Sequence, residues 1–501
     1  MLDVAVAQLR YSLSLLFGWR FSVRSLEQMI AALHETQREF GVIGSEGNEM
    51  LNGPTLDQES RRRIQLQRFR QQARRAMLHT TYYHTLFSQL AIDPAKLRYE
   101  DIAHLPCTPK EAVRDDPDAF VSRQARPYLR ATTTGTTGRP TSICFSAHEL
   151  RVYSALSAMP TFFTHDLQET DIIQISTSSR GILSNVCLAG ACAHIGAMVY
   201  LSGVIDPAVA LAQLCEKRRI VGKKEQTSVL STYPSYLGEL VEYGLAQKYR
   251  PSDFGLERII VGGEIVTQGL KKRCKQLFGP VRFIEGSGMT EIWPVGGRLC
   301  EAGHLHFEVS QGLIEVQRLD STDLAQEGEI GTLVVTPFPP YRETTLLLRY
   351  NTQDVVRVLP STLSCSLRHL DATSNILGKR GFLVQHEQSW TFPRAVLEAL
   401  EAVEELPLPA RCGFWSEPGG VALEVQCREN TPALQRKIKN SLQEWGVSVQ
   451  ALHLVEKGQP LQHPLPFRCD LHEYHFADLS SVQFDNTRAY STSLHRAPTI
   501  A

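Results

Sequence analysis

Thr132-Thr-Thr-Gly-Thr-Thr-Gly-Arg-Pro-Thr141 is the most informative stretch of the chain, because six hydroxyl side chains and two glycines fall within ten residues. Glycine lets the backbone approach a ligand closely. Hydroxyls and exposed backbone N–H groups supply the dense set of donors that polyphosphate oxygens need. The stretch is not a Walker loop, which requires G-x-x-x-x-G-K-[ST]. It predicts a phosphate-binding turn, with a surface hairpin or a linker as the alternative.

Further glycine-rich and acidic segments follow in the sequence and agree with a nucleotide site. Gly262-Gly-Glu264 follows the apolar run Arg258-Ile-Ile-Val261, and Glu285-Gly-Ser-Gly-Met-Thr-Glu291 follows the strand-like run Val281-Arg-Phe-Ile284. Arg349-Tyr-Asn-Thr-Gln-Asp354 and Gly378-Lys-Arg380 come next. Their order and distances favour the nucleotide interpretation over a lone surface turn.

Together these motifs resemble the adenylate-forming superfamily of acyl-CoA synthetases and adenylation domains. They are most like its phenylacetate–CoA ligase-like branch, which includes coenzyme F390 synthetase-like proteins. Upstream, Tyr82-Tyr-His-Thr-Leu-Phe87 and Leu105-Pro-Cys-Thr-Pro-Lys110 are similar to the N-terminal helix and turn of that branch. The resemblance runs from about residue 60 to about residue 470.

Composition excludes several other classes of protein. The 501 residues are 43% hydrophobic and 21% charged, which is ordinary for a globular protein. Lys and Arg number 52 and Asp and Glu 53, so the near-neutral chain has no charge signature for nucleic acid or for an anionic membrane. Eleven scattered cysteines favour a reducing compartment. No segment predicts a membrane span or a secretory signal, and we expect a cytoplasmic protein.

The resemblance implies an α/β fold with a large N-terminal domain of several β-sheets and packed helices, and a small mobile α+β C-terminal domain. Apolar runs alternate with helical patterns up to about residue 376, as such a core requires. Near the C-terminus, residues 421–425 and 447–455 predict strands that flank a helix beginning at Pro432 and ending at Gly446. The expected divisions are a helical extension at 1–55, an AMP-binding domain at 56–377, a hinge at 378–382, a small domain at 383–480 and a tail at 481–501.

The helical extension is not part of the family pattern. Its apolar periodicity predicts helices that either cap the large domain or mediate self-association as a homodimer, and the capping role is favoured.

Carboxylate activation by ATP needs the phosphates, Mg²⁺, the adenosine and the acid to be held in place, so catalysis is mostly positioning and electrostatics. By resemblance, the first stretch wraps the β- and γ-phosphates with Thr133, Thr134, Gly135, Thr136, Thr137, Gly138 and Arg139. The resemblance places around the rest of the nucleotide Gly262, Gly263, Glu264, Glu285, Gly286, Ser287 and Asp354. Asp354 would accept the ribose hydroxyls, Thr290 would contact the α-phosphate, and Glu291 would ligate Mg²⁺.

The acyl pocket is expected beside the nucleotide. Its candidate residues are Tyr233, Tyr236, Gly288, Trp293 and Pro294. An aromatic wall would favour an aryl or arylacetic acid over a long fatty acid. The alternative for each aromatic side chain is a plain core position.

A metal site is also possible by resemblance, because part of this branch holds structural Zn²⁺. Cys300, His306 and Cys365 match its pattern, and thiolate and imidazole suit tetrahedral Zn²⁺. The pattern usually closes with Cys-x-Cys, but position 367 is Leu, so His304 or His369 would be the fourth ligand. The alternative is a vestigial site with free cysteines.

Several positions depart from the family. Arg139 replaces a lysine, Ser287 replaces a tyrosine that stacks on adenine, and Gln353 replaces a glycine. The hinge, usually Gly-Arg-x-Asp-Asp, is Gly378-Lys-Arg-Gly-Phe382, so Lys379 or Arg380 would stand for the arginine. The catalytic C-terminal lysine is missing from residues 461–471, where Arg468 is the only cation apart from histidine.

Three functional hypotheses follow from the resemblance. The first is an ATP-dependent ligase that forms an acyl-adenylate and transfers the acyl group to CoA or to an acyl-carrier protein after a domain rotation near the hinge. The second transfers the acyl group of the adenylate, with release of AMP, to an amine or to a protein acceptor, as in specialised biosynthesis. The third is a degenerate homologue that binds a ligand or partner without turnover, because fold does not fix function.

Overall fold

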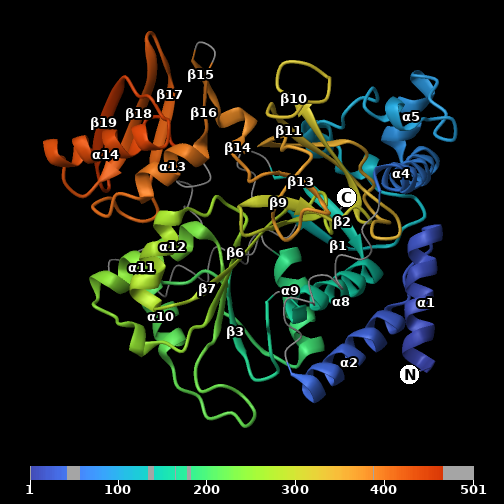
Figure 1. Ribbon diagram of the computed structural model, residues 1–501, viewed down its shortest axis with the longest axis horizontal. Helices are drawn as coiled ribbons and strands as arrows, with labels where there is room; N and C mark the ends of the chain where they lie inside the picture. The colour runs from blue at the N-terminus through green and yellow to red at the C-terminus, as the bar shows by residue number, and fades with distance from the viewer. Residues whose placement is uncertain are drawn as a thin grey trace, which may run out of the picture.

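The computed structural model describes residues 2–41, 57–133, 140–163, 165–177, 182–386 and 389–465. Within these ranges the chain forms packed layers of helices and sheets, followed by a smaller α+β part near the C-terminal end (Figure 1). This confirms the expected fold class. Among the described residues, no helix combines the length and the apolar character needed to cross a membrane.

The largest sheet has a parallel core. Its strands are β3 Ile172–Ser176, β4 Met198–Leu201, β5 Val229–Thr232, β6 Arg258–Gly262, β7 Arg282–Gly288, β8 Gly296–Leu299, β9 His304–Phe307 and β13 Asp371–Ser374. Their order is β13-β9-β8-β7-β6-β5-β3-β4. The five strands from β3 to β7 run parallel to one another, and β8, β9 and β13 are added at one edge in antiparallel pairs. β3 and β5 are buried throughout, as strands with both faces covered should be.

Helices cover both faces of this sheet (Figure 1). The helices are α8 Ala147–Phe163 and α9 Ile182–Ile195 on one face, and α10 Pro207–Cys215, α11 Pro234–Ala246 and α12 Gln268–Phe278 on the other. Ile173 and Ile175 of β3 belong to the main core, whereas Leu230 of β5 and Ile259 of β6 belong to a second cluster with α10, α11 and α12. The parallel strands therefore lie between two apolar layers.

A second sheet stands beside the first. Its strands are β10 Gly312–Arg318, β11 Ile330–Pro337, β12 Tyr350–Arg357 and β14 Gly378–Lys379, which pair antiparallel in that order. β1 Pro127–Thr132 and β2 Ser142–Ser146 form a hairpin that flanks residues 134–139. The β12–β14 pairing brings the predicted hinge against the strand that carries Asp354.

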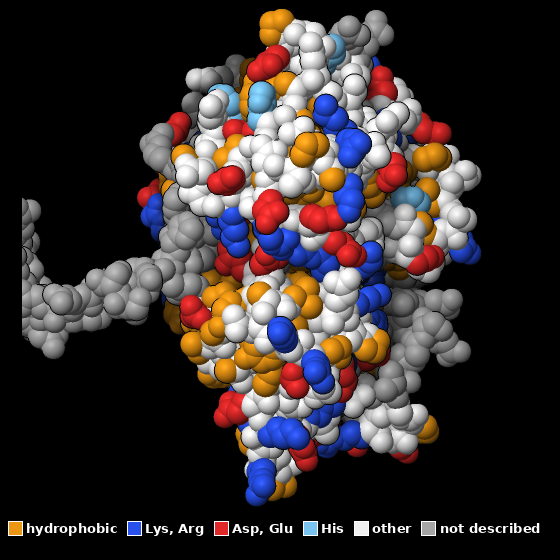
Figure 2. All heavy atoms as spheres, turned by 90° about the vertical axis from the view of Figure 1, so that its left-hand side faces the viewer, with side chains coloured by type: hydrophobic (Ala, Val, Ile, Leu, Met, Phe, Trp, Pro, Cys, Tyr) orange, Lys and Arg blue, Asp and Glu red, His pale blue; other side chains and the backbone are white. Residues whose placement is uncertain are grey.

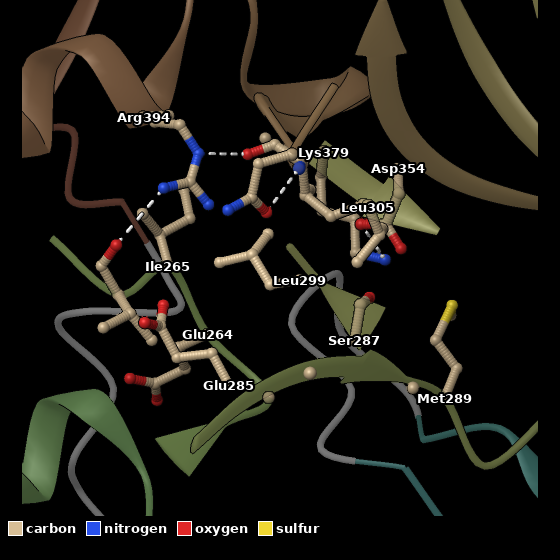
Figure 3. A pocket seen from close by; sticks show the side chains of 17 residues that line it. Glu264, Ile265, Glu285, Ser287, Met289, Leu299, Leu305, Asp354, Lys379 and Arg394 are labelled. Atoms are coloured by element: carbon tan, nitrogen blue, oxygen red, sulfur yellow. Dashed lines mark hydrogen bonds and ion pairs between the residues drawn. The ribbon is translucent and has the colours of Figure 1, made fainter. Parts of the chain in front are cut away.

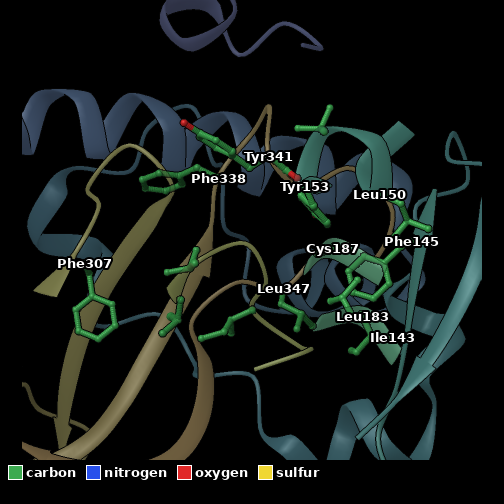
Figure 4. Close-up of a cluster of buried hydrophobic side chains, with 14 of the residues drawn as sticks. Ile143, Phe145, Leu150, Tyr153, Leu183, Cys187, Phe307, Phe338, Tyr341 and Leu347 are labelled. Carbon is green, nitrogen blue, oxygen red and sulfur yellow. Dashed lines mark hydrogen bonds between the residues drawn. The ribbon is translucent and has the colours of Figure 1, made fainter. Parts of the chain in front are cut away.

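The N-terminal helices pack into the main core. They are α1 Leu2–Phe17, α2 Val23–Phe40, α4 Gln58–His79, α5 Thr81–Gln89, α6 Tyr99–Ile102 and α7 Lys110–Asp115. The Phe21 ring lies 5.3 Å from the Tyr11 ring and 5.0 Å from the Tyr341 ring, between centroids. Tyr341 packs in turn with Phe338 and Tyr153 (Figure 4). The first two helices therefore pack against the main core.

The C-terminal part contains the expected β-α-β unit. Its elements are β15 Val384–His386, β16 Ser389–Thr391, α13 Pro393–Glu401, β17 Cys412–Glu417, β18 Gly420–Cys427, α14 Pro432–Glu444 and β19 Ala451–Glu456. β18 and β19 pair in parallel. β19 begins four residues later than predicted, because Gly446 has a φ of +68° and the Val447 N–H still bonds to Leu442 O at 2.8 Å.

Charged side chains join the C-terminal part to α11 and α12. Figure 2 views the molecule from the left-hand side of Figure 1 and shows Lys, Arg, Asp and Glu side chains in a band across its middle. Glu242 accepts from Arg273 at 2.9 Å and also pairs with Arg428, while Arg411 lies 3.3 Å from Glu239. Apolar side chains cross the same boundary, since Leu408 packs in the cluster of α11 and α12 and Ile265 packs in the C-terminal cluster.

Candidate active site

One pocket collects most of the predicted nucleotide residues (Figure 3). The predicted residues that line it are Gly263, Glu264, Glu285, Gly286, Ser287, Gly288, Asp354 and Lys379. Gly378 of the predicted hinge also lines the pocket, as do residues for which no role was predicted: Ile265, Val266, Met289, Leu299, Leu305, Asn375, Ile376 and Arg394. The walls therefore come from β7, from the β8–β9 hairpin, from β12 and β14, and from α13.

Asp354 and Lys379 form an ion pair at the edge of the pocket. The β12–β14 register places them directly opposite each other, and Lys379 Nζ lies 2.8 Å from Asp354 Oδ1. Lys379 also donates to Thr352 O at 3.2 Å. The guanidinium of Arg380 instead donates to Leu319 O at 2.6 Å, and this side chain is exposed. Of the two hinge cations, Lys379 is the one that lines the pocket.

Glu291 lies in a buried polar triad. Lys110 Nζ lies 3.2 Å from Glu291 Oε1, and the Tyr350 hydroxyl donates to the same oxygen at 3.1 Å. Burial alone would raise the pKa of Glu291, but the Lys110 ammonium, with Lys379 adding to it, holds that pKa below its ordinary value. The carboxyl group is therefore ionised at neutral pH.

Lys110 was missed as a site residue. The sequence does contain a feature that could have indicated this role: Lys110 ends the Leu105-Pro-Cys-Thr-Pro-Lys segment that resembles the family. The side chain lies at the start of α7 and is 11% exposed. Nothing local in the sequence links it to Glu291, which is far away along the chain.

Two acidic residues that were predicted to lie around the nucleotide also bind other side chains and backbone groups of the protein. Glu264 accepts from the Ser235 N–H and the Ser235 hydroxyl, both at 2.8 Å, at the N-terminal turn of α11. Glu285 pairs with Lys271 of α12. Both carboxylates still line the pocket. Their contacts anchor the segment after β6 and the strand β7, both of which line the pocket.

Glycine allows close packing at two of the predicted nucleotide residues, Gly262 and Gly263. Gly263 has a φ of +85°, a conformation that side chains disfavour, and a Cβ there would lie 3.2 Å from the Tyr233 ring. A Cβ on Gly262 would lie 3.0 Å from Gly286 O of the neighbouring strand. Tyr233 therefore packs against the backbone turn that leads into the pocket.

The predicted acyl-pocket residues separate into two groups. The Trp293 ring packs over Gly288, since a Cβ on that glycine would lie 3.3 Å from the ring. Pro294 follows it and is half-buried. Tyr236 is fully buried in the second core, and its hydroxyl donates to Ile205 O at 2.6 Å. Trp293 thus stands next to the pocket, whereas Tyr236 serves the core.

Some predicted residues cannot be placed against the pocket. Residues Thr134, Gly135, Thr136, Thr137, Gly138, Arg139 and Arg468 lie outside the described ranges. Thr133 is described, and its hydroxyl accepts from the Thr141 N–H at 3.1 Å. Thr290 is half-buried in the turn between Met289 and Glu291.

The predicted metal ligands come together. Cys300, His304, His306 and Cys365 offer ligand atoms that all lie within 4.8 Å of one another, so His304 rather than His369 completes the set. Burial and the neighbouring His304 lower the pKa of His306 to about 4, which keeps the imidazole in the neutral form that binds metals. Two thiols and two imidazoles fit tetrahedral Zn²⁺. We refer to these residues as the metal quartet.

The comparisons with known proteins identify the family of the chain. The family described as AMP-binding enzyme matches residues 66–336, which is more than half of the chain. The phenylacetate-coenzyme A ligase of Thermus thermophilus is 24% identical over 366 residues, covering 70% of this chain and 78% of the relative. The enzyme of the same name from Pseudomonas putida is 23% identical over 365 residues, with the same coverage.

Solved structures share the fold. A 2-hydroxyisobutyryl-CoA ligase in the postadenylation state, in complex with R3-HIB-AMP, superposes with a TM-score of 0.67 at 19% identity, covering 81% of this chain and 88% of that one. The same ligase with 2-HIB-AMP and CoA in the thioesterification state has a TM-score of 0.55 at 19% identity, with 81% and 89% covered. The chain belongs to the family of AMP-binding enzymes, and within the adenylate-forming superfamily to its phenylacetate–CoA ligase-like branch.

Proposed function

We propose that the protein is an AMP-forming acid–thiol ligase that converts a carboxylic acid, ATP and CoA into an acyl thioester, AMP and pyrophosphate. The observation that carries the proposal is the pocket in which Asp354 and Lys379 stand opposite the Glu285–Met289 strand end, with Glu291 close by. The Asp354 carboxylate can accept hydrogen bonds from ribose hydroxyls, and the Lys379 ammonium can pair with a phosphate. Membership of the family supports ATP as the substrate.

In the first half-reaction, a carboxylate oxygen of the acid attacks the α-phosphorus of ATP, and the bond to the bridging oxygen breaks to release pyrophosphate. Lys379 and Lys110 would screen the negative charge, and Asp354 would hold the ribose hydroxyls. Bound Mg²⁺ would supply further charge neutralisation, and the ionised Glu291 carboxylate is the oxygen ligand that suits it. In this proposal, residues 133–139 bind the β- and γ-phosphates, and Thr290 contacts the α-phosphate.

In the second half-reaction, the thiol of CoA attacks the acyl carbon and AMP leaves with the bonding electrons. We assign this step to CoA rather than to a carrier protein because the named relatives are CoA ligases. The proposed divisions are a large domain to residue 377, a hinge at 378–382 and a small domain from 383. We infer that the small domain rotates between the two steps, and that the ion pairs of Glu239 with Arg411 and of Glu242 with Arg428 form and break as it does.

The proposed acid is aryl or arylacetic. Two observations support this class: Trp293 packs over Gly288 beside the pocket, and the relatives are named phenylacetate-coenzyme A ligases. A flat aromatic ring is a suitable wall for a flat acyl group. Tyr236 does not contribute, since its side chain is a core residue.

The test is pyrophosphate release with ATP–Mg²⁺ against aryl, arylacetic, amino-aryl and fatty acids, with and without CoA. We expect release that depends on one aryl or arylacetic acid and a thioester that forms only with CoA. An adenylate that forms but is not consumed by CoA would identify an amine or protein acceptor instead. Folded protein that neither releases pyrophosphate nor binds ATP would identify a non-catalytic homologue.

A further inference from the structure

The β8–β9 hairpin carries two sets of side chains with different environments. Leu299 and Leu305 are directly cross-strand from each other, and both line the nucleotide pocket. Cys300 follows Leu299, and His304 and His306 flank Leu305, so three members of the metal quartet are sequence neighbours of the two leucines. Alternation along β9 turns Leu305 to one face of the strand and both histidines to the other.

Leu305 occupies a hollow made by small residues on the neighbouring strands. Ser287 of β7 stands opposite Gly297 of β8 in the register. A Cβ on Gly297 would lie 2.4 Å from Leu305 Cγ, so the leucine side chain lies directly over this glycine. Figure 3 shows Leu299 and Leu305 in the pocket together with Ser287 and Lys379. Serine offers no stacking surface for a base. Leu299 is half-buried and brings apolar surface to the same place, and the buried Leu305 supports it from the opposite strand.

The metal quartet joins the hairpin to a separate segment. Cys365 precedes β13, which pairs with β9, and it packs with Cys300, Leu367 and Leu370 in a small apolar cluster. Cys365 Sγ lies 3.3 Å from His306 Nε2. A metal ion held by all four residues would bond the hairpin turn to this segment at a fixed distance.

We propose that the metal quartet, by holding a tetrahedral ion such as Zn²⁺, positions Leu299 and Leu305 as the apolar wall against which the nucleotide base packs. Zn²⁺ enters as the two thiols release their protons to solvent, and no electron transfer takes place. Cys300, His304, His306 and Cys365 are thus positioning residues. The inference rests on the proposed nucleotide role of the pocket.

Such an arrangement couples two binding sites through one rigid hairpin. If the metal favours the hairpin geometry that binds the nucleotide, the nucleotide must favour metal binding by the same factor. Coupling of this kind commonly changes affinity by five-fold to about 150-fold. A quartet that only stabilised the fold would leave the affinity for ATP unchanged in protein that remains folded.

The experiment measures ATP binding by calorimetry to protein loaded with Zn²⁺ and to protein stripped with a chelator, with zinc content from atomic absorption and folding from circular dichroism. We expect one zinc per chain in the loaded form and about tenfold weaker ATP binding in the stripped form. In turnover assays, stripping should raise KM for ATP with a smaller effect on kcat. Re-addition of Zn²⁺ should restore the affinity.

Three variants separate the contributions. Cys365→Ser should lose zinc and bind ATP as the stripped protein does. Leu299→Ala should keep its zinc but bind ATP weakly whether or not zinc is present, because the wall that the metal positions is gone. Cys215→Ser removes a thiol outside the quartet and should behave as the wild type.

Equal ATP affinity in loaded and stripped protein, or failure to bind zinc at all, would overturn the inference and leave the proposed function intact. Failure of both forms to bind ATP would overturn the proposed function, and this inference with it.

Discussion

Lys110 and Glu291 form a buried ion pair. Because the pKa of Glu291 is held below its ordinary value, the pair stabilises the fold at neutral pH, and that contribution is lost as the pH falls through the lowered pKa. In Lys110→Met, burial would instead raise the pKa of the carboxyl group. We expect the free energy of unfolding at pH 7 to fall by about 3 kcal/mol.

The measurement is urea unfolding of both proteins at pH 7 and pH 5. The deficit of Lys110→Met should shrink at pH 5, where the unpaired carboxyl group takes up a proton. The double variant Lys110→Met with Glu291→Gln is the matched control and should recover most of the loss at pH 7. A deficit that stays the same at both pH values, or that the double variant does not reduce, would contradict the buried-pair account.

Lys379 and its neighbour Arg380 give a direct comparison of two cations in the proposed hinge. Lys379 contacts Asp354 in the pocket, whereas Arg380 contacts Leu319 O outside it. Loss of one preorganised electrostatic contact typically costs about 10²-fold to 10³-fold in rate. We expect a loss of this size in the rate of adenylate formation for Lys379→Met and less than a twofold change for Arg380→Met. Equal losses in both variants would remove the special role of Lys379.

Gln353 adopts a conformation that suits glycine better. Its φ is +61°, and it occupies the position where the resemblance places a glycine. A non-glycine residue in this region costs about 1 kcal/mol, so Gln353→Gly should raise the free energy of unfolding by up to that amount. Gln353→Ala keeps the strained conformation and should not be stabilised. Thermal unfolding of the three proteins is the check, and a stabilised alanine variant would count against the strain.

At the scale of elements, the pocket illustrates what the sequence can and cannot predict. The end of β6 at Gly262 was predicted because an apolar run stops where glycine and acidic residues begin. The predicted end of the next strand before Glu285 was wrong, because β7 continues to Gly288 and its last residues pair with β8. The contribution of Leu305 to the pocket was not predicted, since a leucine in a strand predicts only burial. Its place in the pocket depends on the register of three strands and on the small residues beside it.

Glu242 on α11 contacts both α12 and the C-terminal part of the chain. It accepts from Arg273 and Arg428 and from the Leu408 N–H at 3.3 Å. We expect Glu242→Gln to loosen the interface and to increase tryptic cleavage near Lys379 and Arg380. Lys272→Met is the control, because its exposed pair with Glu404 should contribute little. Unchanged cleavage in Glu242→Gln would indicate that the docking rests on other contacts.

At the scale of the whole molecule, the α/β architecture was predictable because the motifs of the family are spread along most of the chain. The meeting of Lys110 with Glu291, and of Arg394 with the pocket, was not predictable. Each contact joins residues far apart in sequence, and packing of complete layers decides whether they meet. The same holds for the choice of His304 over His369 in the metal quartet.

The missing C-terminal lysine concerns the whole molecule, since that lysine would come from the small domain. The described pocket already holds Lys379 and has Lys110 near Glu291. We therefore place the cations for adenylate formation on the large domain and the hinge. This predicts that the first half-reaction proceeds without a lysine from residues 461–471.

The most direct test of the account is the exchange of labelled pyrophosphate into ATP, measured without CoA in the presence of each acid of the panel. The account predicts exchange that requires one aryl or arylacetic acid and that falls sharply in Lys379→Met but not in Arg380→Met. Absence of exchange with every acid, in folded protein that binds ATP, would contradict acyl-adenylate formation by this pocket.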